Sequence, residues 1–161
     1  MKLFSIISIL GALTSCTSNI SDQKRIMRTI EAHIQLPEGA RPIEAYSRNY
    51  ARLPDHKILA VFIEPFEPSR IDETEDYGCE ILGDFDENGE LESRPCTEDE
   101  IEETNEMEET ISESHGNANG SRWFKNSHDL PVMDDGGCSL IEVIFDLRSD
   151  SFDSIMCNGP Y

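Results

Sequence analysis

The stretch CSLIEVIFDLRSDSFDSIMC, residues 138–157, decides the fold class because it holds the clearest strand pattern in the chain. Residues 139–147 are rich in β-branched and aromatic side chains, the next four residues are polar, and apolar residues return over 152–157. Apolar runs separated by a short polar segment are typical of a β-hairpin. We therefore predict two antiparallel strands here, preceded by a tight or left-handed backbone at Gly136-Gly137.

A further strand is predicted at KILAVFI, residues 57–63. The run is short, continuous and rich in β-branched residues, which indicates a buried strand. Glu64-Pro65 follows it directly and ends the apolar pattern.

Two helices are predicted before this strand. The first can be capped by Ser21 or Asp22 and is ended by Pro37. Its apolar stripe consists of isoleucines at every fourth position, namely Ile26, Ile30 and Ile34. The second helix is expected to begin near Pro42, with Ile43, Tyr46 and Tyr50 on one face. We assign these tyrosines to core packing rather than to ligand binding.

These patterns predict one α+β domain over residues 22–161, with two N-terminal helices on a small antiparallel sheet of three to five strands. A central acidic and partly disordered insertion, at about 65–121, interrupts it. Residues 71–113 carry a formal charge of −18, whereas residues 1–70 carry +2 and residues 114–161 carry −4. So acidic a segment argues against nucleic acid or anionic lipid as its partner and leaves cations, basic proteins or plain water.

Within the insertion, TEDEIEETNEMEETISES begins with Thr97 and Glu100 at the spacing of a capping box. Acidic residues near a helix N-terminus also interact favourably with the helix dipole. The segment is either a solvated helix or a disordered acidic stretch, since few apolar residues repeat along it. SHGNANGS, residues 114–121, is expected to be a flexible loop.

The chain opens with MKLFSIISILGALTSC, in which Lys2 precedes an apolar run that is too short to span a bilayer. Its last four residues, Leu13-Thr14-Ser15-Cys16, resemble the lipobox of bacterial lipoproteins. The resemblance implies that residues 1–15 are a signal peptide, that Cys16 is lipidated, and that residues 16–21 are a tether. Several acyl chains on one cysteine give stable membrane anchoring. The alternatives are an ordinary cleaved signal and an uncleaved anchor.

The same resemblance places the protein in the cell envelope. Thr17 follows Cys16, where an aspartate would resemble an inner-membrane retention signal. We therefore expect attachment to the periplasmic face of the outer membrane rather than to the inner membrane.

If Cys16 is lipidated, four cysteines remain for an oxidising compartment: Cys79, Cys96, Cys138 and Cys157. We favour the pairs Cys79–Cys96 and Cys138–Cys157 because each pair brackets an expected hairpin. Simple two-residue turns would leave both pairs out of register, so bulges or longer turns are needed. Zinc is the competing use of four cysteines, but no C-x-x-C spacing occurs.

The segment DFDENGELE, residues 84–92, resembles part of an EF-hand loop. Asp84, Asp86 and Asn88 stand at alternate positions, Gly89 falls at the sharp turn, and Glu90 would offer its carbonyl. The position of the bidentate glutamate is occupied by Pro95, so a Ca²⁺ site here would be weak. The alternative reading is a solvent-exposed hairpin turn.

Enzyme signatures are not recognisable in the sequence. It contains neither a G-x-S-x-G elbow nor a glycine-rich phosphate loop. The histidines are scattered and are expected at the surface; they are His33, His56, His115 and His128. We therefore do not expect an enzyme, and no catalytic residue is assigned.

IQLPEGARPIEAYSRNYA and the later DLPVMDDGGCSLIEVIFD together resemble a group of small exported alphaproteobacterial proteins. This resemblance implies an architecture and supplies no activity. Two functional hypotheses follow from the sequence. In the first, a lipid-anchored envelope protein presents an acidic surface to a basic envelope protein; in the second, residues 84–92 form a weak calcium-binding module.

Overall fold

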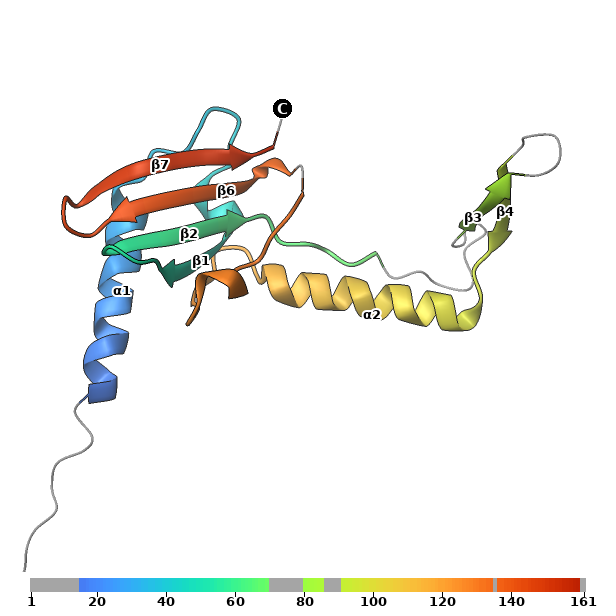
Figure 1. Ribbon diagram of the computed structural model, residues 1–161, viewed down its shortest axis with the longest axis horizontal. Helices are drawn as coiled ribbons and strands as arrows, with labels where there is room; N and C mark the ends of the chain where they lie inside the picture. Colours follow the sequence, from blue (N-terminus) through green and yellow to red (C-terminus); the bar gives the residue numbers. More distant parts are fainter. Residues whose placement is uncertain (1–14, 70–79, 86–90, 135, 160–161) are drawn as a thin grey trace, which may run out of the picture.

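The computed structural model describes residues 15–69, 80–85, 91–134 and 136–159 (Figure 1). Five strands form one mixed sheet in the order β5-β1-β2-β6-β7, and β3 and β4 form a separate two-stranded sheet. The α-helices and short 3₁₀ helices are α1 (Ser15–His33), η1 (Ile43–Ala45), α2 (Glu98–His115) and η2 (Ser127–Asp129). The strands are β1 (Ser47–Arg52), β2 (Lys57–Ile63), β3 (Glu80–Phe85), β4 (Leu91–Pro95), β5 (Ser121–Trp123), β6 (Gly137–Asp146) and β7 (Ser151–Asn158).

The C-terminal hairpin and the KILAVFI strand are confirmed. β6 pairs with β7 as the predicted antiparallel hairpin, and β2 lies beside β6 near the centre of the sheet. The side chains of β2 are buried or half-buried along its whole length, as a continuous apolar run requires. These three strands form the core of the fold.

The prediction of two N-terminal helices on an antiparallel sheet is wrong. Only a 3₁₀ turn forms at Ile43–Ala45, and the residues after it become strand β1, which pairs with β2. Tyr46 and Tyr50 are four residues apart, a spacing that suits one face of a helix and also one face of a strand. Both tyrosines are fully buried, so pairing with the apolar β2 strand decides between the two structures.

The sheet is mixed because β5 pairs with β1 in parallel. β5 begins within the SHGNANGS segment that we expected to be a flexible loop. That segment is held by backbone hydrogen bonds, in which Asn119 donates to Tyr46 and Arg48 donates to Gly120. A parallel partner for β1 could not be anticipated, because the two strands are more than 70 residues apart in the chain.

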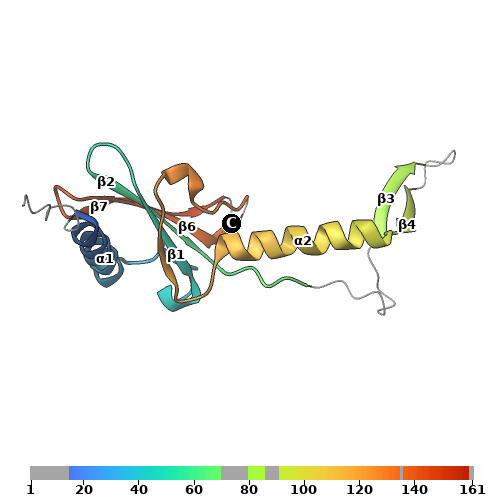
Figure 2. The ribbon, with the colours of Figure 1, turned by 90° about the horizontal axis from the view of Figure 1, so that it is seen from below.

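Helix α1 covers one face of the five-stranded sheet (Figure 2). Ile26 and Ile30 of the predicted stripe are buried in one core cluster with Tyr50 of β1 and with Tyr46, which directly precedes that strand. Glu31 adds polar contacts between the helix and the sheet: its carboxylate lies 3.3 Å from Arg48 and accepts hydrogen bonds from the hydroxyls of Tyr50 and Ser121. Buried area and these contacts together hold α1 on the sheet.

Helix α1 begins at Ser15, before the predicted cap at Ser21 or Asp22. It therefore includes residues 16–21, which we expected to form a tether. In the part of the chain that the structure describes, no helix is long and apolar enough to cross a membrane.

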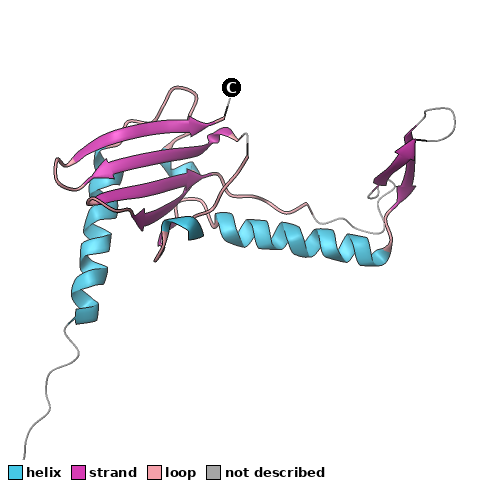
Figure 3. Cartoon of the chain, in the orientation of Figure 1, coloured by secondary structure: helices cyan, strands magenta, loops and turns pink. Residues whose placement is uncertain are grey.

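The other face of the sheet is covered by the segment that follows β5. Phe124, Leu130 and Met133 of this segment pack on Val61 and Leu140 of the sheet. Figure 3 shows this segment as loops and one short helical turn, so it covers the face less completely than a long helix would.

Helix α2 projects away from the sheet, with the β3–β4 hairpin at its far end (Figure 1). The predicted capping box is confirmed: Glu100 N–H donates to the Thr97 hydroxyl, and the Glu100 carboxylate accepts from Thr97 N–H. Arg94 forms a bidentate pair with the same carboxylate at 2.6 and 2.8 Å. These contacts, with the Arg94 hydrogen bonds first, lower the pKa of Glu100 to about 2. Residues Glu98–His115 of the acidic segment therefore form a capped helix.

Candidate functional site

The structure confirms the Cys138–Cys157 disulfide. The register problem is solved by a bulge: Gly137 pairs with Asn158 and Ile141 pairs with Cys157, so the register shifts between these two pairs. This bulge places the two Cα atoms 4.5 Å apart. Cys96 is also disulfide-bonded, and its expected partner, Cys79, lies outside the described residues.

The predicted calcium ligands are only partly visible. Asp84 belongs to strand β3, and Asp86, Asn88 and Glu90 lie outside the described residues. β3 and β4 pair as antiparallel strands on either side of that gap. Among the described residues, no group of three His, Cys, Asp or Glu side chains is placed to hold a metal ion.

Helix α2 presents a strongly acidic surface. It contains nine Asp or Glu residues and no Lys or Arg. Seven of these acids are exposed, and they are Glu98, Asp99, Glu102, Glu103, Glu106, Glu109 and Glu113. The remaining face of the helix is half-buried against residues 66–69, where the Ser112 hydroxyl donates to the Phe66 carbonyl. The exposed acids therefore line the outer side of a projecting helix.

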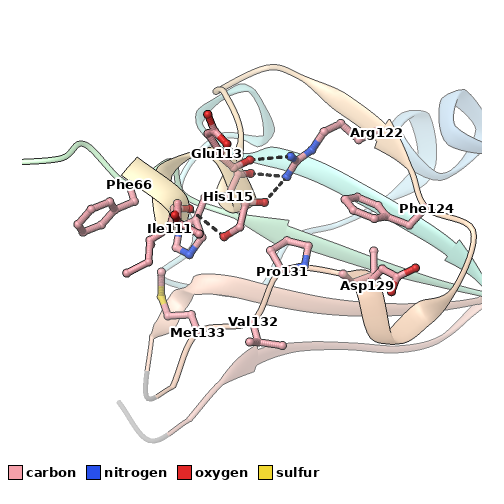
Figure 4. A pocket seen from close by; sticks show the side chains of 13 residues that line it. Phe66, Ile111, Glu113, His115, Arg122, Phe124, Asp129, Pro131, Val132 and Met133 are labelled. Atoms are coloured by element: carbon pink, nitrogen blue, oxygen red, sulfur yellow. Dashed lines mark hydrogen bonds between the residues drawn. The ribbon is translucent and has the colours of Figure 1, made fainter. Parts of the chain in front are cut away.

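Arg122 of β5 holds the C-terminal end of α2 on the sheet. Its guanidinium donates to the backbone carbonyls of Glu113, Ser114 and His115 at 3.0, 2.5 and 2.8 Å (Figure 4). Its Nε donates to the side chain of Asn49, which is fully buried in β1. The last carbonyls of a helix have no partner within the helix and carry partial negative charge, so a cation stabilises them.

Gly116 follows the helix at φ 77°, a left-handed conformation that strains other residues. A Cβ atom there would lie 2.8 Å from the Arg122 Cζ and 2.9 Å from the Ser47 hydroxyl. Glycine thus lets the arginine approach the helix end. Burial lowers the pKa of Arg122, but a guanidinium still carries its charge near neutral pH.

An apolar groove lies at this junction, with a volume of about 890 Å³. Phe66, Ile111 and His115 form one wall, and Phe124 with residues 130–133 forms the other (Figure 4). We call it the basal groove because it lies at the base of α2. Val132 is 82% exposed there, although it is an apolar residue.

His115 is buried, so the prediction that all four histidines lie at the surface is wrong for this residue. Its Nδ1 lies 3.2 Å from the Glu64 carbonyl, and its ring packs edge-on against Phe66. Burial lowers the pKa of His115, which favours the neutral ring near neutral pH. The wall that His115 contributes is therefore uncharged under these conditions.

Sequence reasoning missed Arg122, His115 and the basal groove. A glycine after an acidic helix signals a C-terminal cap, so Gly116 could have marked the helix end. A basic residue shortly after that end could then have been proposed as a cap. The groove has no comparable local signal, because its two walls come from separate segments of the chain.

Comparison with known proteins does not assign the chain to a family. No family model matches the chain, and neither a curated protein nor a solved structure matches it.

Proposed function

We propose that the protein is a lipid-anchored interaction module of the cell envelope, which presents helix α2 to a basic partner protein. The observation that carries the proposal is the exposure of seven acids on one projecting helix without a single Lys or Arg. Repulsion among these acids destabilises the helix, so α2 depends on its caps and tertiary contacts. Here Thr97 caps one end and Arg122 holds the other.

The mechanism is electrostatic complementarity. A row of carboxylates steers a basic surface toward the helix and selects against acidic partners. Because the acids are exposed, mobile ions screen them, and binding should weaken as salt rises.

The first test replaces four exposed acids of α2 by Glu102→Gln, Glu103→Gln, Glu106→Gln and Glu109→Gln. Full-length chain is immobilised, and captured basic proteins of an envelope extract are quantified at low and high salt. Exposed ion pairs contribute about 0.2–1 kcal/mol each, so we expect capture at low salt to fall about tenfold.

The matched control removes the same charge from the sheet domain by Glu44→Gln, Asp55→Asn, Glu142→Gln and Asp150→Asn, which are also exposed acids. Capture by the control should equal that of the unmodified chain. Equal losses in both variants would mean that net charge, rather than α2, governs binding, and would refute the proposal.

The second test concerns Cys16. We expect Cys16→Ser to abolish labelling of the chain by fatty acid and to move it from the membrane fraction to the soluble fraction. Ser15→Ala keeps a small residue before the cysteine and should leave labelling intact. An unmodified Cys16 thiol on membrane-fraction protein, observed by mass spectrometry, would exclude lipid anchoring.

A further inference from the structure

We infer that the basal groove receives a large apolar side chain of the partner, flanked by basic residues that pair with the acids of α2. The inference rests on the proposed function and specifies the segment that α2 would recognise: a short basic peptide segment with one aromatic or large aliphatic anchor.

The groove suits an apolar anchor. Its walls are formed mainly by Phe66, Ile111, Phe124, Val132 and Met133. The volume of about 890 Å³ is large enough for a partner side chain. Val132 is the most exposed large apolar side chain of the described residues, and covering it would remove apolar surface from water.

One further exposed apolar side chain, Met107, lies on α2 beyond the groove. Glu103, Met107, Thr110 and Ser114 are spaced by four, three and four residues, so they share one face of the helix. Thr110 and Ser114 line the groove, and Met107 is 57% exposed one turn further out. A partner segment leaving the groove would therefore cross Met107 and reach Glu103.

The charges around this path select a basic segment. Asp99 and Glu106 flank Glu103 on the same side of the helix, and all three are exposed. Arg122 lines the groove, but its guanidinium donates to three helix carbonyls and to Asn49. The path therefore offers carboxylates to a partner, while the adjacent cation is already engaged by the protein.

Charge also argues against a second copy of this chain as the occupant. Each copy carries a formal charge of −20, so two copies would repel one another where α2 approaches its equivalent. In sedimentation experiments we accordingly expect the full-length chain not to associate with itself through the groove. Val132→Ser should therefore leave its sedimentation unchanged.

The distance from the groove along α2 determines how long the probe peptide must be. Asp99 and Thr110 are eleven positions apart in the chain, which is about 16 Å along a helix. An extended peptide covers that distance in about five residues. The probe is the fluorescent peptide Lys-Ala-Lys-Ala-Lys-Phe-Lys-Ala-Lys-Ala-Lys. Because its Phe is central, five residues can follow α2 from the groove whichever way the peptide runs. Its matched partner has Ser in place of Phe.

Binding of both peptides to full-length chain in non-ionic detergent is measured by fluorescence anisotropy, with detergent alone as the blank. We expect the Phe peptide to bind about tenfold more tightly, since half-burial of a Phe ring supplies that factor. Val132→Ser should weaken binding of the Phe peptide several-fold and leave the affinity for the Ser peptide unchanged. Ile20→Ser is the control: it removes an exposed apolar side chain, 54% exposed against 82% for Val132, from α1 on the opposite face of the sheet.

The outcomes separate the two proposals. Equal affinity of both peptides, or an equal effect of Val132→Ser on both, overturns the groove inference while the acidic helix still binds. If neither peptide binds at low salt, both the inference and the proposed function fail. Glu103→Gln with Glu106→Gln should weaken both peptides, and no change would remove these acids from the recognition path. Self-association that Val132→Ser abolishes would make a second copy the occupant of the groove, against the inference.

Discussion

Replacing Arg122 by alanine is expected to lower the free energy of unfolding by about 3 kcal/mol and to free the C-terminal end of α2 from the sheet. The variant removes hydrogen bonds to three helix carbonyls and leaves the buried side chain of Asn49 without this donor. Urea denaturation measures the loss of stability. Hydrogen exchange should show reduced protection in the last turns of α2, with smaller changes in β2 and β6.

Two variants accompany this measurement. Arg122→Lys keeps the positive charge but cannot reach three carbonyls and Asn49 together, so we expect only partial recovery. Arg94→Ala removes an arginine from the other end of α2, where the pair with Glu100 is exposed to solvent. It should have little effect on unfolding. If Arg94→Ala and Arg122→Ala destabilise the chain equally, the assigned role of Arg122 is wrong.

Removal of the Cys138–Cys157 disulfide is expected to cost about 3 kcal/mol of stability, because it closes a loop of roughly 20 residues in the unfolded chain. The double variant Cys138→Ser and Cys157→Ser leaves the disulfide at Cys96 in place. Its urea midpoint, compared with the unmodified chain under oxidising conditions, gives the effect. The bulge in β6 would then no longer be fixed by a covalent bond.

Met156→Ser is the control for the double cysteine variant, since Met156 lies beside Cys157 in β7 and is 55% exposed. We expect its midpoint to stay near that of the unmodified chain. A double cysteine variant as stable as Met156→Ser would show that strand pairing and packing hold the hairpin without the disulfide.

Elements with strong local patterns were predictable from the sequence. The KILAVFI strand, the C-terminal hairpin, the isoleucine stripe and the Thr97 capping box each depend on residues within a few positions of one another. Tyr46 and Tyr50 were correctly assigned to the core, although Tyr50 lies in strand β1 and Tyr46 directly before it, where a helix was predicted. A spacing of four residues does not distinguish one face of a helix from one face of a strand.

The rest depends on contacts between distant segments. β5 is a three-residue strand with no periodicity of its own, and only its pairing with β1 defines it. The same pairing brings Arg122 beside Asn49 and the end of α2. The basal groove then follows, because it requires α2, β5 and residues 130–133 to meet.

The parallel pairing of β1 with β5 has a consequence for the order of folding. The β1–β2 and β6–β7 hairpins are local and can form on the microsecond timescale. The β1–β5 and β2–β6 pairings both span the excursion that contains α2, from Arg48 to Ser121 and from Ile63 to Leu140. Whichever pairing forms first bears almost all of the entropic cost of closing that long loop, so the second pairing adds little further cost. We therefore expect the sheet to assemble in one cooperative step, in which the two preformed hairpins and the short edge strand β5 pair while α2 remains outside.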